Sequence, residues 1–297
     1  MLISSLILGS LHAMVPITMT ATGEILSERA GLVNIGLEGI LLISAFTAVV
    51  GAEAYGPLAG LLVGLLTGAF IGLIHGIIAI YFRGDQTISG VGINVLGAGL
   101  VAFGLVWQWG QAGFHQVPRA VRVPAISTPW GPLSPMVIVA LVLAVLTWYL
   151  MNRTNLGLKL RAVGENPAAA DAAGVSVEKV RLFGAVFAGA LAGLAGAFLS
   201  IDWLATITKN LSAGRGFIAL ATVVFSGLNP LLAIVGGLIF GFFNSLALVA
   251  STSRELTRVI PYQFLQMLPY VVTLLVVAGV IGRVRFPRAS GQPYRRE

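Results

Sequence analysis

Five side chains in apolar surroundings carry groups that can contact a polar solute. Asn94 and Asn244 are single amides in apolar runs, where an amide hydrogen-bonds either a neighbouring helix or a polar ligand. Asn34 and Glu38 are four residues apart, so both would lie on one face of a helix. Phe217 follows a Gly-Arg-Gly tripeptide and could line a pore or stack on a ring. These residue types predict a path for a polar solute with contacts from Asn34, Glu38, Asn94, Phe217 and Asn244.

Charge gathers in one stretch of a chain in which only 10% of residues are charged: RAVGENPAAADAAGVSVEKVR, residues 161–181. Asn166 is a good helix N-cap, Pro167 suits a first helical turn, and the alanines that follow propagate a helix. Gly174 is placed to end it, and Ser176 to cap the next apolar run. A short capped helix is therefore predicted here, with an ordinary surface turn as the alternative.

Motifs for nucleotide and metal chemistry are missing from the sequence. It has no G-x-x-x-x-G-K-[ST] loop to cradle ATP, no H-E-x-x-H, no G-x-S-x-G and no cysteine. His12 and His75 are isolated in apolar segments, where a histidine satisfied within the core is commoner than a ligand or a proton relay. We therefore expect no catalytic residue, no metal site and no cofactor in this chain.

The composition is that of a polytopic membrane protein. Mean hydropathy is +0.93, 57% of residues are hydrophobic and 37 are glycine. A span needs about 20 apolar residues, so the chain has room for roughly eight to ten helices and no separate soluble domain. We expect an all-α transmembrane bundle formed from nine apolar segments: 2–19, 35–52, 57–82, 88–110, 135–151, 178–201, 217–228, 230–251 and 262–282.

One of these segments is unusually short. Residues 217–228 cannot cross a hydrocarbon core about 30 Å thick, and a half-helix that lines a cavity is expected there. Glycine-rich stretches at 88–104 and 214–228 stand at comparable places in the two halves of the chain. Paired glycine-interrupted segments of this kind point to a transport path.

Small residues also predict how some helices pack. Glycine recurs at every fourth position from Gly60 to Gly76, which places these residues along one stripe of the third segment. A similar ladder runs from Ala185 to Ala197 in the sixth. Such stripes let two helix backbones approach closely.

Positive charge is distributed unevenly over the predicted connections. If the first residues face outward, the inner connections and the C-terminal tail hold twelve of the 18 lysines and arginines. Because cytoplasmic loops carry an excess of these residues, we expect an external N-terminus and a cytoplasmic C-terminus. The net charge of +7 has the same explanation, so membrane lipid is an expected partner and nucleic acid is not.

Three motifs resemble a known family: GEILSERAGLVNIGLEG at 23–39, RAVGENPAAADAAGVSVEKVR at 161–181, and GRGFIALATVVFSGLNPLLAIVGGLIFG at 214–241. The resemblance is to the permease subunits of bacterial ABC importers for nucleosides and simple sugars, which are related to the ribose and branched-chain amino-acid permeases. It extends over most of the chain, from about residue 16 to residue 282, apart from the connections 111–134 and 251–261.

This resemblance implies a type II ABC importer permease architecture with broken or half helices, in one domain of residues 1–297. It implies that a loop at 152–177 contains a coupling helix that docks on a cytoplasmic ATPase, and that this ATPase uses ATP-Mg. It also implies a second, related permease chain, an external lipid-anchored binding protein and a place in the bacterial inner membrane. The coupling residues would be Arg161, Gly164, Glu165, Asn166, Pro167, Asp171 and Gly174.

We therefore expect a transport subunit, not an enzyme, that forms the path for its substrate by alternating access. Nucleoside and simple sugar both remain open as the substrate, and the nucleoside branch is the closer match. The alternatives are a stand-alone secondary carrier or channel for a small polar solute, and an intramembrane enzyme. The enzyme would need a catalytic group within a span, such as His12 or His75.

Overall fold

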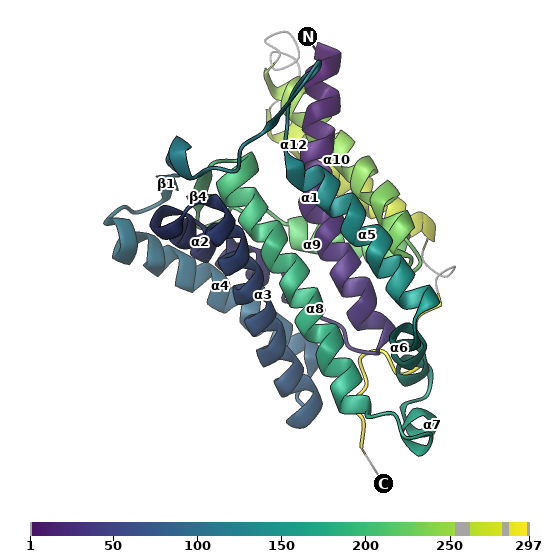
Figure 1. Ribbon diagram of the computed structural model, residues 1–297. Helices are drawn as coiled ribbons and strands as arrows, with labels where there is room; N and C mark the ends of the chain where they lie inside the picture. The colour runs from purple at the N-terminus through teal and green to yellow at the C-terminus, as the bar shows by residue number, and fades with distance from the viewer. Residues whose placement is uncertain (1, 253–261, 281–284, 296–297) are drawn as a thin grey trace.

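Helices make up nearly the whole of the computed structural model, which describes residues 2–252, 262–280 and 285–295 (Figure 1). The predicted all-α fold class is confirmed. The long helices are α1 (Leu2–Arg29), α2 (Leu37–Tyr55), α3 (Pro57–Gly76), α4 (Gln86–Trp109), α5 (Pro135–Arg153), α8 (Val177–Phe198), α10 (Pro230–Thr252) and α12 (Tyr262–Val280). The shorter helices are α6 (Asn155–Glu165), α7 (Pro167–Ala172) and α9 (Arg215–Phe225), with π-helical turns at Ile77–Tyr81 and Leu199–Trp203 and a 3-10 turn at Arg119–Val121.

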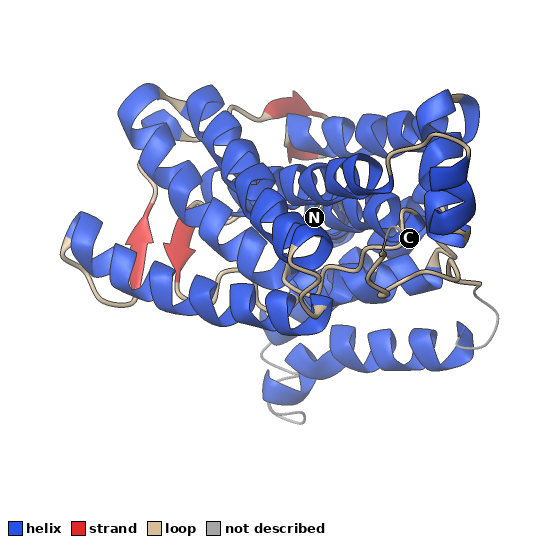
Figure 2. Cartoon of the chain, turned by 90° about the horizontal axis from the view of Figure 1, so that it is seen from below, coloured by secondary structure: helices blue, strands red, loops and turns tan. Residues whose placement is uncertain are grey.

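Seven helices of the described part are long and apolar enough to cross a membrane: α1, α2, α3, α4, α5, α8 and α10. The helix in the seventh predicted segment, α9, has 11 residues and is too short to cross, as expected for that segment. The ninth predicted segment contains α12, and its residues 281 and 282 lie outside the described part. In Figure 2, α12 is the helix flanked by grey traces, and it lies at the edge of the bundle.

The first helix is longer than predicted. Residues 20–29 were expected to follow the first span, but α1 continues through them to Arg29. They include no proline, and Glu24 in this part of the helix is completely buried. One oxygen of Glu24 accepts a hydrogen bond from the backbone N–H of Asn34, at 2.7 Å. This contact fastens the helix to the connection that follows it.

Asn34 and Glu38 do not share a helical face, so that part of the prediction is wrong. Asn34 lies in the connection before α2, which begins at Leu37. Its side-chain oxygen accepts a hydrogen bond from the N–H of Gly36, at 2.8 Å. A local bond of this kind offers the backbone an alternative to a helix, which explains the late start of α2.

Short strands fix the connections at one end of the bundle. β1 (Phe114–Gln116) pairs antiparallel with β4 (Thr206–Thr208), and β2 (Ile126–Thr128) pairs antiparallel with β3 (Gly131–Leu133). The first pair ties the connection after α4 to the segment that leads to α9. It is held to α2 by Glu53, which contacts His115 at 2.6 Å and accepts a hydrogen bond from Trp109 at 2.8 Å.

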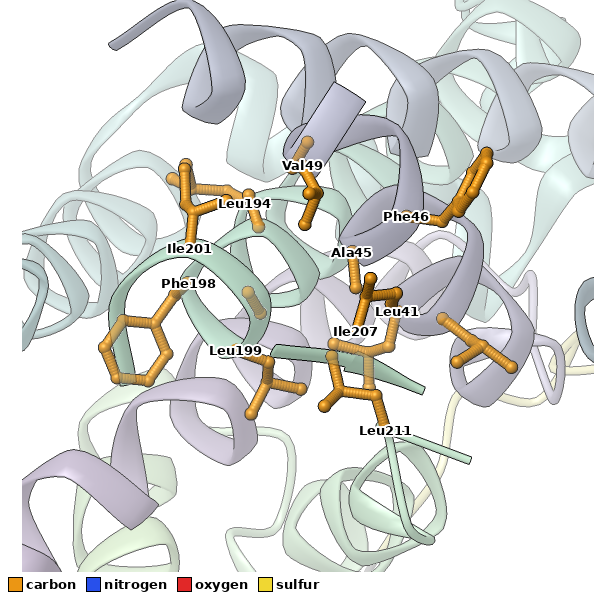
Figure 3. Packing of buried hydrophobic residues seen from close by; sticks show 14 of the residues in the cluster. Leu41, Ala45, Phe46, Val49, Leu194, Phe198, Leu199, Ile201, Ile207 and Leu211 are labelled. Carbon is orange, nitrogen blue, oxygen red and sulfur yellow. The ribbon is translucent and has the colours of Figure 1, made fainter. Parts of the chain in front are cut away.

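The main core lies between α2 and α8. Leu41, Ala45 and Val49 of α2 face the end of α8 and its π-helical turn, where Leu194, Phe198 and Ile201 pack against them (Figure 3). The predicted ladders of small residues bring α3 against the other side of α8. A Cβ atom at Gly68 or Gly72 of α3 would collide with the α8 backbone, so these two glycines are needed for helix packing.

The two chain ends lie at opposite ends of the bundle. Figure 1 shows the N-terminus beyond the start of α1 and the C-terminus beside α6 and α7. The charged stretch 161–181 therefore lies at the same end as the C-terminal tail. Four of the basic residues counted in the sequence, Arg254, Arg258, Arg283 and Arg296, lie outside the described part.

Candidate functional site

The half-helix α9 begins inside the bundle, and Glu38 binds its N-terminus. The N–H groups of Gly214 and Gly216 donate to the two carboxylate oxygens of Glu38, at 2.6 and 2.7 Å. The 11 residues of α9 extend about 16 Å at 1.5 Å each, roughly half the thickness of a hydrocarbon core of about 30 Å. A carboxylate is stabilising there because it faces unpaired N–H groups and the positive end of the helix dipole.

Glycine is required where the two elements meet. A Cβ atom at Gly216 would lie 2.5 Å from the backbone nitrogen of Glu38 and 2.6 Å from its Cα. Gly214, just before the helix, has a φ of +77°, a conformation that favours glycine. The Gly-Arg-Gly tripeptide therefore serves the close approach of α9 to α2.

Asn94 of α4 holds the start of α2. Its side-chain oxygen accepts a hydrogen bond from the N–H of Gly39 at 2.8 Å, and its amide nitrogen donates to the carbonyl of Ile35 at 3.0 Å. The sequence left two roles open for this amide, a hydrogen bond between helices and a contact to a ligand, and these bonds are of the first kind. The same side chain also lines a cavity.

Two cavities flank the N-terminus of α9. The first, here called the Asn94 cavity, has a volume of about 340 Å³. The second, the Asn244 cavity, has a volume of about 310 Å³. Ala213 lines both, so the turn before α9 separates them. The Asn94 cavity is lined by Glu38, Gly39, Leu42, Asn94, Ala98, Lys209, Asn210, Ser212, Ala213 and Gly214. The Asn244 cavity is lined by Trp203, Leu204, Ala213, Arg215, Asn244, Ala247, Leu248, Ser251 and Tyr270.

Three of the five predicted path residues thus lie beside α9, namely Glu38, Asn94 and Asn244. Asn34 is completely buried and lines neither cavity. Phe217 lies on α9 with half of its surface exposed, outside both cavities. Arg215, Trp203 and Tyr270 were not predicted. The aromatic residues carried no signal because isolated aromatics are common in membrane helices.

The two isolated histidines have hydrogen-bond partners within the protein, as expected; His75 is completely buried and His12 is partly buried. His75 contacts the hydroxyl of Ser89 at 3.0 Å and the carbonyl of Val33 at 3.1 Å. His12 contacts the carbonyl of Leu8 at 2.8 Å and the N–H of Ser134 at 3.2 Å. Each ring is therefore held by neighbouring segments. No group of three or more His, Cys, Asp or Glu residues with metal-binding geometry is found among the described residues.

The charged stretch contains the predicted short helix. α7 covers Pro167–Ala172, and the side-chain oxygen of Asn166 accepts a hydrogen bond from the N–H of Ala169, at 3.0 Å. Gly174 has a φ of +82° just after the helix. Ser176 stands at the N-cap position of α8, but its side chain makes no capping hydrogen bond. The predicted short helix, with its start and stop residues, is confirmed.

A second helix, α6, precedes α7 and was not predicted. Thr154 caps it by accepting a hydrogen bond from the N–H of Gly157, at 3.2 Å. Leu156, Leu160 and Val163 recur at helical spacing, and the last two are completely buried, so this pattern could have revealed the helix. Only Asn166, in an extended conformation, separates α6 from α7.

The two short helices enclose a groove of about 630 Å³, here called the α6–α7 groove. Glu165 and Asn166 line it, together with apolar side chains such as Leu158. Pro167 and Gly174 frame α7, and Arg161 lies in a separate cavity beside Arg29. The groove is lined by Asn155, Leu158, Lys159, Ala162, Glu165, Asn166, Ala169, Ala170, Ala173 and Val175.

The C-terminal tail, residues 285–295, joins the α6–α7 region to the ends of α1 and α8. The N–H of Ala289 donates to the carbonyl of Gly164 at 2.9 Å, and that of Gly291 donates to the carbonyl of Gly31 at 3.1 Å. The hydroxyl of Tyr294 donates to Asp171 at 3.2 Å. Two of the predicted coupling residues, Gly164 and Asp171, are therefore contacted by the tail.

Arg181 anchors this tail from within the protein. The side chain is only 2% exposed and donates to the carbonyls of Ala30 at 3.1 Å, Gln292 at 2.8 Å and Ala289 at 3.3 Å. In the sequence it could not be told from the surrounding basic residues that face solvent. Its contacts depend on a tail more than 100 residues away along the chain.

We expect Arg181→Met to lower the free energy of unfolding by about 3 kcal/mol, since it removes three hydrogen bonds to a buried charged group. The melting temperature of the detergent-purified chain would measure this. Arg153→Met, at an exposed position at the end of α5, is the matched control and should leave the melting temperature close to that of the wild type. Equal melting of the two variants would contradict the anchoring role.

A family model described as the permease component of branched-chain amino acid transport systems matches residues 6–278. The guanosine ABC transporter permease protein NupQ of Bacillus subtilis is 36% identical, over 99% of this chain and 97% of its own. The nucleoside ABC transporter permease protein NupC of Lactococcus lactis is 36% identical, over 94% of this chain and 93% of its own. The guanosine permease protein NupP of B. subtilis is 29% identical, over 79% and 73%. No solved structure matches the chain.

The chain belongs to this permease family, because the family model covers most of its length and two relatives at 36% identity are matched nearly end to end. It is a multi-pass membrane protein and the permease subunit of an ABC transporter, in which a separate chain hydrolyses ATP. The predicted family, and a role as a transport subunit and not an enzyme, are confirmed.

Proposed function

We propose that this permease forms the membrane path of a nucleoside importer, with simple sugars as the second candidate substrate. The full-length similarity to permeases for guanosine and for nucleosides supports the substrate class. The observation that supports the position of the path is the half-helix α9, whose N-terminus lies inside the bundle between two cavities. Irregular backbone at membrane depth is tolerated where it lines a cavity, so this is where a polar solute would pass.

The proposed orientation puts the N-terminus outside and the C-terminus in the cytoplasm of a bacterial cell. The excess of Lys and Arg at the end that holds α6, α7 and the tail supports this orientation. The α6–α7 groove would then face the ATPase and receive it, and residues 152–177 would form the coupling element. An external binding lipoprotein would deliver substrate at the other end. The chain itself would carry no cofactor.

A second, different permease chain is the proposed partner within the membrane. NupQ and NupP are both guanosine permeases of one organism, and this chain is similar to each. α4 offers a surface for such a partner, because Val95, Leu96 and Phe103 on it are well exposed. Gly92 and Gly99 on the same helix have nothing within contact distance, so another helix could approach closely there.

A continuous series of contacts would carry motion from the ATPase to the path. The tail binds Gly164 near the end of α6 and Gly31 just after α1, and Arg181 binds both the tail and Ala30. Residues 30–36 then lead directly to α2, whose Glu38 holds the N-terminus of α9. Displacement of α6 and α7 would thus shift the segment that positions the half-helix.

Neutralising the coupling element is expected to separate ATP hydrolysis from uptake. In the double variant Glu165→Gln, Asp171→Asn, we expect a folded permease whose complex still hydrolyses ATP. Uptake per ATP should fall at least about fivefold, because the two carboxylates would no longer transmit the movement of the ATPase to α7. Uptake and hydrolysis measured together in proteoliposomes test this. Glu178→Gln, which removes a carboxylate from the neighbouring helix α8, is the control and should retain normal coupling. Normal coupling in the double variant would show that these carboxylates do not have the proposed role.

The importer itself is tested by reconstituting the chain with an ATPase, a partner permease and a binding protein. ATP-dependent uptake of radiolabelled nucleosides is expected from the complete assembly, and none from vesicles that contain this chain alone. Uptake by the chain alone would instead support the stand-alone carrier or channel. Uptake of pentoses and not of nucleosides would move the substrate to the sugar class.

A further inference from the structure

We propose that the Asn244 cavity binds the base of a 6-oxopurine nucleoside and selects it over adenosine through Arg215. This inference deepens the proposed function and rests on it. The cavity is lined by residues of α9, α10 and α12, and α10 is long and apolar enough to cross a membrane. Asn244 comes 14 residues after the start of α10, or about 21 Å along the helix, and Arg215 is at the inner start of α9. An arginine that faced lipid at this depth would be costly, so the cavity must hold water or a polar ligand.

The guanidinium of Arg215 is fixed in position, but some of its N–H donors remain available. Its carbon lies 5.1 Å from the centre of the Trp203 ring, and its Nη1 donates to the carbonyls of Leu211 at 3.1 Å and Ser212 at 3.2 Å. Trp203 is itself stacked on Phe198, with ring centres 6.1 Å apart. The other guanidinium nitrogens, Nε and Nη2, make no hydrogen bond within the described part of the protein.

The positive charge of Arg215 also has no direct acidic partner. No carboxylate of the described residues lies within 4.0 Å of it. Glu38, the acidic side chain just across the turn, uses both oxygens on the N–H groups of Gly214 and Gly216. The positive end of the α9 dipole, at the same place, adds further positive potential. The cavity therefore favours a ligand that presents hydrogen-bond acceptors.

The remaining walls suit a flat ring. The hydroxyl of Tyr270 donates to the carbonyl of Ala213 at 2.8 Å, which holds the ring of Tyr270 at the cavity wall with 45% of the residue exposed. Leu204 and Leu248 provide apolar surface, and the amide of Asn244 can both donate and accept. The volume of about 310 Å³ is at the lower end of the range for small-molecule sites.

The donor pattern of arginine determines which base fits. A guanidinium has donors and no acceptor, so it pairs best with two adjacent acceptors. A 6-oxopurine presents such a pair at O6 and N7, whereas adenine presents an N6 amino donor beside N7. Adenine would therefore place a donor against a donor. We infer that Arg215 reads the O6 and N7 edge, with Tyr270 against the ring and Asn244 on the remaining polar groups.

The test compares uptake of labelled inosine and adenosine by the complete reconstituted importer. Arg215→Lys keeps the charge but loses the planar pair of donors. Because a good two-point contact to a base contributes about 1–3 kcal/mol of discrimination, we expect the inosine-to-adenosine ratio of kcat/KM to fall at least about fivefold. Arg119→Lys, an exposed residue between β1 and β2, is the matched control and should keep the wild-type ratio.

The outcomes distinguish this inference from the proposed function. If the wild-type importer takes up no nucleoside, the proposed function fails. If it takes up nucleosides and Arg215→Lys leaves the ratio unchanged, or lowers both rates equally, the inference about Arg215 is overturned.

If a variant is inactive in transport, the site can still be tested by measuring ligand binding. Equilibrium dialysis of labelled inosine against the wild-type transporter, without the binding protein, is expected to show saturable binding that Asn244→Ala weakens. Unlabelled inosine should compete, and adenosine should compete more weakly. Absence of saturable binding up to millimolar inosine, or competition by inorganic phosphate as strong as that by inosine, would overturn the site as a base-binding site.

Discussion

Replacing Gly68 with valine is expected to prevent α3 from packing on α8. A Cβ atom at Gly68 would collide with the carbonyl oxygen of Gly189, and one at Gly189 would collide with that of Gly68. Both obstacles are backbone atoms, which cannot move without displacing a helix. We expect Gly68→Ala to cost roughly 1–3 kcal/mol by overpacking. Gly68→Val should abolish the folded chain, because its branched side chain needs still more room.

The yield of monodisperse protein on size-exclusion chromatography, and its melting temperature in detergent, would measure this effect. Gly92→Val in α4 is the matched control, since a Cβ atom there has nothing within 4 Å in the single chain. This control should purify and melt like the wild type. If Gly68→Val also does so, α3 and α8 do not depend on close backbone contact.

Features that depend on residues close in sequence were predictable. The glycine ladder of α3 follows from a four-residue repeat, and α7 follows from Asn166, Pro167 and Gly174, because capping is a local property. The short α9 follows from the length of its apolar run. These patterns also supported the class of protein, since together they describe a polytopic bundle with a broken helix and a charged element at one end.

Features that depend on contacts distant in sequence were not predictable. Glu38 could be recognised as a polar group near the membrane, but its partners Gly214 and Gly216 are 176 and 178 residues away. Asn94 is similar, because its amide can serve a ligand or a helix and only the fold decides. Arg181 resembled the solvated charges around it. In each case the residue type indicated a polar partner, and tertiary structure determined which.

Removal of the carboxylate of Glu38 is expected to impair transport more than any other change within the path. Glu38→Ala would leave the N–H groups of Gly214 and Gly216 unpaired inside the bundle and place the helix start beside Arg215 without a compensating negative charge. Two charge-assisted hydrogen bonds contribute together about 3 kcal/mol or more. The half-helix would no longer be held between the two cavities, so we expect uptake to fall at least about tenfold while the protein remains in the membrane.

Initial rates of uptake, normalised to the amount of folded permease, would test this role, with ATP hydrolysis measured in parallel. Glu38→Gln should fall between the wild type and Glu38→Ala, because the amide oxygen can still accept one hydrogen bond while its NH₂ group opposes the second N–H. Glu53→Gln makes the same change on the same helix, at its contact with His115 and Trp109, and serves as the control. We expect it to lower the melting temperature slightly and to leave normalised uptake unchanged. If Glu38→Ala transports as well as this control, the position of α9 does not depend on Glu38, and the series of contacts from the coupling element to the path must end elsewhere.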